Sequence, residues 1–129
     1  MRAELRGDVR AAAAARRFVA TALSDLGEEP GSPPPDDVML VVSELVTNSV
    51  QAGAELIDVE LTVTDDRVEL SVTDGADGWP ATRHPSWDDP HGRGLAIVES
   101  IADEWYATLL DPGKRVTAKW FRVVAGHLG

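Results

Sequence analysis

The clearest candidates for chemistry are Glu44 and Asn48, which lie four residues apart in the segment SELVTNSV. On a helix, this spacing puts a carboxylate and an amide on the same side, one turn apart. Such oxygen ligands suit Mg²⁺, which takes few protein ligands and keeps waters and phosphate oxygens around it. An ordinary polar helix face is the alternative. Against it, asparagine is a poor mid-helix residue, and the stretch from Val38 to Val50 is otherwise mostly apolar.

A second candidate is the segment from Asp74 to Gly78, DGADG, which follows a stretch of alternating apolar residues. A strand would bring this aspartate to the edge of a sheet, and glycines let the backbone come close to a ligand. A buried carboxylate there can accept a hydrogen bond from an exocyclic amine, such as that of adenine. A surface turn is the alternative, because Asp-Gly turns are common.

The third candidate is Gly92-Arg93-Gly94, at the expected start of a helix. Free N–H groups and the positive end of a helix dipole favour a phosphate there. The segment is neither a Walker A motif nor a dinucleotide fingerprint, and incidental glycines at a loop–helix junction are the alternative. The irregular loop at residues 79–91 precedes it and is long enough to close over a ligand as a lid.

Apolar periodicity predicts the elements that position these residues. The expected helices cover residues 8–26 and 36–52, with Asp8 and Asp36 as N-caps, and a third begins at Gly92. The expected strands cover residues 57–63, 68–73, 104–110 and 116–124. Helices on one face of a mostly antiparallel sheet fit this order, so we expect an α+β two-layer sandwich.

Composition narrows the class of protein. The 129 residues suit a single domain, and the absence of cysteine excludes disulfides, thiolate zinc sites, iron–sulfur clusters and cysteine nucleophiles. A net charge of -10 repels phosphate backbones and anionic lipids, so we expect no direct nucleic-acid or membrane binding. There is no apolar run of the roughly 20 residues that a membrane span needs, and no apolar stretch that would mark a secretion signal. We therefore expect a cytoplasmic protein.

Together these motifs resemble a known family. Residues 43–50 resemble the N box of the GHKL, or Bergerat-fold, ATP-binding superfamily, Asp74 to Gly78 resemble its G1 box, and Gly92 to Leu95 its G2 box. The loop at 79–91 falls where that family has its ATP lid. In the segment VVSELVTN and in its small size, the chain resembles the stand-alone anti-sigma factor and serine-protein kinase branch, which has a histidine-kinase-like ATPase domain. The resemblance covers the chain from about Val9 to Val123.

The resemblance implies ATP and Mg²⁺ as cofactors. It makes Asn48 the Mg²⁺ ligand, Glu44 the general base that draws a proton from a partner's serine or threonine hydroxyl, and Asp74 the reader of the adenine amine. The family often has a threonine near the start of the last strand, which supports the adenine pocket; here Arg115 occupies that position, and Thr117, two residues on, points the same way. The other implied nucleotide-binding residues are Gly78, Gly92, Arg93, Gly94 and Leu95.

The implied function is an ATP/Mg²⁺-dependent serine/threonine protein kinase that acts as an anti-sigma factor in a partner-switching pathway. Its implied partners are a sigma factor and an anti-sigma-factor antagonist of the STAS type, and a homodimer is left open. Ala76 stands where the G1 pattern Asp-x-Gly-x-Gly has its first glycine. The alternative is therefore a catalytically weak or inactive module, nucleotide-binding or nucleotide-free, that sequesters a protein partner.

Overall fold

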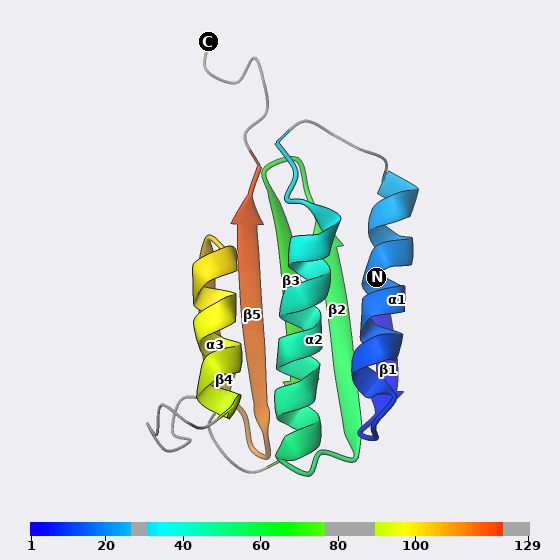
Figure 1. Cartoon of the computed structure of the whole chain (residues 1–129), viewed down its shortest axis with the longest axis vertical. Coiled ribbons are helices and arrows are strands. Elements are labelled where there is room, and N and C mark those ends of the chain that lie inside the picture. Colours follow the sequence, from blue (N-terminus) through cyan, green and yellow to red (C-terminus); the bar gives the residue numbers. More distant parts are fainter. Residues whose placement is uncertain (27–30, 77–89, 123–129) are drawn as a thin grey trace.

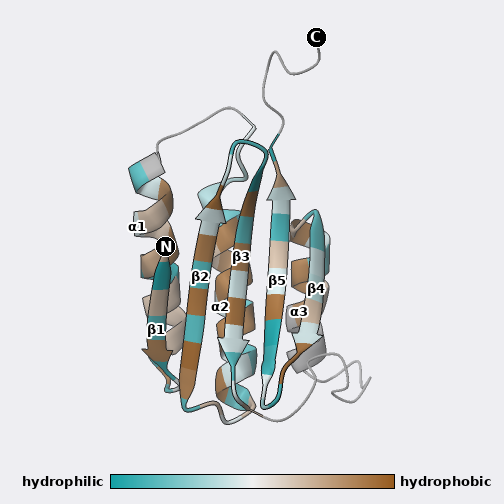
Figure 2. Ribbon diagram, turned by 180° about the vertical axis from the view of Figure 1, so that it is seen from behind, coloured by the Kyte–Doolittle hydropathy of each residue, from teal (hydrophilic) through white to brown (hydrophobic). Residues whose placement is uncertain are grey.

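The structure, a computed structural model, describes residues 1–26, 31–76 and 90–122. Its elements are β1 (Arg2–Arg6), α1 (Ala11–Leu26), α2 (Pro35–Gln51), β2 (Leu56–Val63), β3 (Arg67–Asp74), α3 (Pro90–Ile101), β4 (Glu104–Leu109) and β5 (Lys114–Phe121). The strands form one antiparallel sheet in the order β1-β2-β3-β5-β4. Figure 1 shows the three helices side by side on one face of this sheet, and Figure 2 shows the opposite face without helices. The predicted α+β two-layer sandwich is confirmed.

The core lies between the sheet and the helices and consists mainly of small aliphatic side chains. Strand alternation puts Ile57, Leu61 and Leu70 on the helix side, where they are fully buried. On α2, the predicted apolar stripe that includes Val42 and Val46 faces them and is also buried. Burying each such side chain stabilises the fold by about 1.5–3 kcal/mol. This packing fixes which residues of α2, β3 and β5 face one another.

Strand β1 differs from the prediction, which had no strand at the N-terminus. The segment pairs with β2 in antiparallel register, from Arg2 opposite Glu60 to Arg6 opposite Leu56. Its two apolar residues, Ala3 and Leu5, are too few for a periodic signal, and backbone pairing with an exposed sheet edge creates the strand instead.

The helix starts also shift. Helix α1 begins three residues after Asp8, whose Oδ1 accepts a hydrogen bond from the N–H of Arg10 at 2.8 Å. Helix α2 has Pro34 at its N-cap position and no side-chain cap, so the prediction of Asp36 as N-cap is wrong. Proline is preorganised for the first turn of a helix, which explains the start at Pro35.

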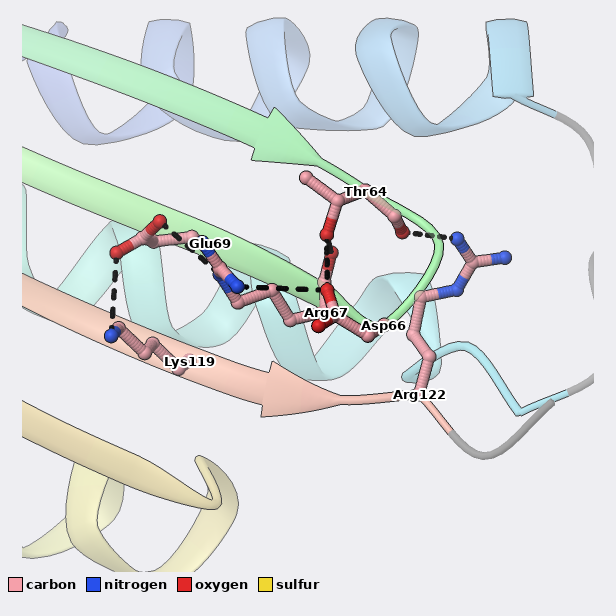
Figure 3. A network of polar contacts seen from close by, with 6 residues as sticks. All are labelled: Thr64, Asp66, Arg67, Glu69, Lys119 and Arg122. Atoms are coloured by element: carbon pink, nitrogen blue, oxygen red, sulfur yellow. Dashed lines mark hydrogen bonds and ion pairs between the residues drawn. The ribbon is translucent and has the colours of Figure 1, made fainter. Parts of the chain in front are cut away.

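A polar network joins the β2–β3 turn to the end of β5 (Figure 3). The Thr64 hydroxyl donates to Asp66 Oδ1 at 2.6 Å, and Arg122 Nη1 donates to the Thr64 carbonyl oxygen at 2.6 Å. The hydrogen bond from Thr64 lowers the pKa of the exposed Asp66 carboxyl, and the charge of Arg67 adds to this effect.

At the opposite end of the molecule, α2 and β3 end and α3 and β5 begin (Figures 1 and 2). In the described ranges, no helix combines the length and apolarity that a membrane crossing requires.

Candidate functional site

The central group of the candidate site is Asp74, the last residue of β3, whose side chain is only 1% exposed. Its Oδ2 accepts a hydrogen bond from the Ser49 hydroxyl, and its Oδ1 accepts one from the backbone N–H of Ala76 at 3.0 Å. The Lys114 ammonium lies 3.1 Å from Oδ1 and 3.0 Å from Oδ2. A carboxylate offers about four acceptor positions. All of them are therefore used within the protein.

Three elements bring these groups together. Ser49 lies on the buried face of α2, and Asp74 and Lys114 are directly opposite each other in the β3–β5 ladder. The turn before β5 approaches closely because Gly113 has φ +90 and no side chain. A Cβ at Gly113 would lie 1.9 Å from the carbonyl oxygen of Asp74, so glycine is required there.

Ala76, the departure from the G1 pattern, is not strained. Among the described residues, only glycines have positive φ, so alanine fits the backbone conformation at this position. Its N–H holds Asp74, and its side chain packs against the core. The alanine therefore leaves the geometry of this turn intact.

Glu44 and Asn48 lie on the same side of α2, and both are half-buried. Arg16 of α1 donates to the Ser43 hydroxyl at 2.8 Å, which marks the side of α2 that faces α1. Helical spacing puts Glu44 and Asn48 on the other flank of the buried face of α2. Because α2 lies between α1 and α3 (Figure 1), this flank is on the side of α3. Within the described ranges, neither side chain makes a hydrogen bond or an ion pair. Both are thus available to a ligand.

These groups fit the chemistry of a magnesium–phosphate complex better than that of a self-contained metal site. In the part of the chain that is described, no three His, Cys, Asp or Glu side chains lie close enough together to hold a metal ion. Mg²⁺ commonly takes only one or two protein ligands and fills its shell with waters and phosphate oxygens. A single amide such as that of Asn48 is compatible with this pattern.

The glycine-rich segment lies at the start of α3, at the same end of the molecule as Asp74 (Figure 1). The helix begins at Pro90, two residues earlier than predicted, so Gly92, Arg93 and Gly94 lie within its first two turns. Pro90 and His91 thus belong to the helix rather than to the expected lid. Leu95 is 9% exposed and belongs to the core. Gly78 and the rest of the expected lid, residues 79–89, lie outside the described residues.

The structure does not bring Thr117 to this site. Thr117 pairs with Ser71 across β3 and β5, and their hydroxyl oxygens are 3.1 Å apart on the helix-free face. Arg115 is on the same face, where its Nε donates to the Thr73 hydroxyl at 3.2 Å. The residue of β5 that reaches Asp74 is Lys114, which sequence reasoning missed. The strand phase could have revealed it, because the apolar residues of β5 alternate in step with Lys114.

Comparisons with known proteins agree with this architecture. The model of a family described as the histidine kinase-like ATPase domain matches residues 5–120. No curated protein matches the chain. The crystal structure of the RsbU and RsbW domains of Rv1364c from Mycobacterium tuberculosis is similar in fold, with a TM-score of 0.65 and 20% sequence identity. The match covers 96% of this chain and 34% of that one, so this chain spans about a third of its length. Because the family model covers nearly the whole sequence, the chain belongs to the histidine kinase-like ATPase domain family, as the GHKL resemblance predicted.

Proposed function

We propose that this chain is a single-domain, ATP- and Mg²⁺-dependent serine/threonine protein kinase that acts as an anti-sigma factor in a partner-switching pathway. The observation that carries the proposal is the placement of Glu44 and Asn48. Both side chains are half-buried and have no protein partner in the described ranges. They lie on the same helix as Ser49, the residue after Asn48, whose hydroxyl donates to Asp74. The family match supports the binding of ATP, and the Glu44–Asn48 pair supports phosphoryl transfer.

In this proposal, each group has one task. The amide oxygen of Asn48 binds Mg²⁺, and the N–H groups at the start of α3, with Gly92 and Gly94, bind phosphate oxygens. The Glu44 carboxylate accepts the proton that a serine or threonine hydroxyl of the partner loses. When bound, ATP supplies the phosphoryl group and Mg²⁺ neutralises the phosphate charge. The protein therefore needs mainly to position the reacting groups and to accept the proton.

The proposed partners are a sigma factor and a STAS-type antagonist, the latter being the substrate. The net charge of -10 favours a basic region on the sigma factor, because complementary charges speed association and reject wrong partners.

Phosphoryl transfer to a candidate antagonist tests the role of Glu44. Glu44→Gln keeps the size of the side chain but removes the base, and transfer should fall by about 10²- to 10⁴-fold while ATP binding is retained. Glu60→Gln is the matched control, because Glu60 is exposed on the helix-free face and its loss should leave transfer unchanged. A wild-type protein that phosphorylates no antagonist from its own genome would contradict the kinase assignment.

A second candidate function is a regulatory module that sequesters its partner without catalysis. The Lys114–Asp74 ion pair favours it, because the carboxylate that would accept the base amine is already engaged. Calorimetry with ATP and ADP separates the two candidates. A module without nucleotide gives no Mg²⁺-dependent heat at millimolar concentrations of either.

A further inference from the structure

The ion pair between Asp74 and Lys114 has a consequence for the proposed nucleotide site, on which this inference rests. We propose that the Lys114 ammonium occupies the position of the purine's exocyclic amine. A purine then reaches Asp74 only when Lys114 leaves, and Lys114 sets how strongly the site selects adenine.

The hydrogen bonds of Asp74 carry this inference. Two of its four acceptor positions are filled by the Ser49 hydroxyl and the Ala76 N–H, and the other two by the Lys114 ammonium. An incoming amine must therefore replace a donor that is already present. No acceptor position remains for it.

Lys114 is the donor that can be replaced. The Ala76 donor is a backbone group, and the Ser49 hydroxyl is on a short side chain of a buried helix face. Lys114, in contrast, has a flexible four-carbon stem, so its ammonium can move without any change in the backbone. Its side chain is 5% exposed, so the ammonium is the donor of this group with a path to solvent.

Base selectivity follows from this arrangement. In the wild-type protein, the 6-amine of adenine competes with an ammonium already bound to Asp74 and adds little affinity. When the ammonium is removed, Asp74 keeps two protein donors and has two free acceptor positions in a buried site. An unpaired buried acceptor is costly, so the carboxylate then favours the amine.

Isothermal titration calorimetry tests this with two ligands that differ only in the amine, ATP and purine riboside triphosphate, each with Mg²⁺. We expect the wild type to bind the two within about twofold. Lys114→Met should bind ATP about tenfold more tightly than the wild type does, and about tenfold more tightly than it binds the analogue, a factor that corresponds to about 1.4 kcal/mol. Lys119→Met is the matched control, because Lys119 lies on the opposite face of the same strand, and it should behave as the wild type.

Either of two results overturns the inference. One is a wild type that prefers ATP to the analogue by tenfold or more, because Asp74 would then already accept the amine. The other is a Lys114→Met variant, folded by circular dichroism, that binds ATP no better than the wild type does.

The outcome is separate from that of the kinase proposal. A gain of ATP affinity in Lys114→Met without phosphoryl transfer by the wild type supports this inference and contradicts the kinase. Phosphoryl transfer by the wild type, without a gain of ATP affinity in Lys114→Met, supports the kinase and contradicts this inference. If the variant does not fold, the ammonium signal of wild-type Lys114 in NMR decides. We expect slow exchange with water in the nucleotide-free protein, and exchange as fast as that of Lys119 would overturn the inference.

Discussion

Replacement of Gly113 by alanine tests whether the turn before β5 holds Asp74 in place. The site depends on this turn, because its backbone touches Asp74 and leads directly into Lys114. Alanine here faces two separate problems. The backbone has φ +90, which L-residues rarely adopt, and the new Cβ would lie 1.9 Å from the carbonyl oxygen of Asp74.

Gly53 provides a matched control that separates these two costs. It has nearly the same backbone conformation, φ +89, but a Cβ there would meet no atom within 4 Å. Gly53→Ala should therefore lower the free energy of unfolding only by the conformational cost, about 1–2 kcal/mol. Gly113→Ala adds a clash of the new Cβ with the backbone of Asp74 and Gly75, which no side-chain movement can relieve, and we expect a total loss of about 3 kcal/mol or more. Gly75→Ala, with open space and no positive φ, should be close to neutral.

Urea unfolding followed by tryptophan fluorescence measures all three variants. The slope with denaturant should stay constant, so that midpoints report stability directly. Equal losses in Gly113→Ala and Gly53→Ala would refute the reasoning, because the close approach to Asp74 would then contribute nothing. A loss in Gly75→Ala as large as that in Gly113→Ala would refute it as well.

Three further outcomes are expected. Thr64→Ala should raise the pKa of Asp66, read from its carboxyl signal in an NMR titration, because the hydrogen bond that favours the charged form is lost. The associated loss of stability should be present in full at neutral pH, should shrink as the pH falls below about 4, and should disappear only below the lowered pKa of Asp66, where the carboxyl is protonated in both variants. Thr117→Val should leave nucleotide binding unchanged in calorimetry, because Thr117 lies on the helix-free face. Leu70→Ala should lower the free energy of unfolding by about 2–5 kcal/mol in urea titrations, because the side chain is fully buried between sheet and helices.

Much of the fold could be predicted because its periodic segments are long. Helices α1 and α2 and strands β2 and β3 each repeat an apolar side chain often enough to reveal which face is buried. Strand β1 could not be found this way, since five residues with two apolar side chains carry almost no pattern. Its existence depends on the unpaired edge of β2, which is a property of the assembled sheet.

The candidate site was predictable where it depends on the spacing within a single helix or strand. Glu44 and Asn48 follow from spacing on one helix, and the burial of Asp74 follows from the phase of β3. The hydrogen bond from Ser49 to Asp74 joins residues 25 positions apart and depends on how α2 packs on the sheet. Lys114 was missed because the last strand was expected to begin only at residue 116, whereas β5 begins at Lys114, where the opposing Asp74 carboxylate offsets the cost of burying its charge.

The helix-free face of the sheet offers a convenient position for a spectroscopic label. The chain has no cysteine, so one introduced thiol would be the only target for a maleimide dye. Thr62 is exposed on this face, across the sheet from the side that carries Asp74 and Lys114. A fluorophore at Thr62→Cys could follow the docking of a protein partner by anisotropy while leaving the helix side chemically untouched.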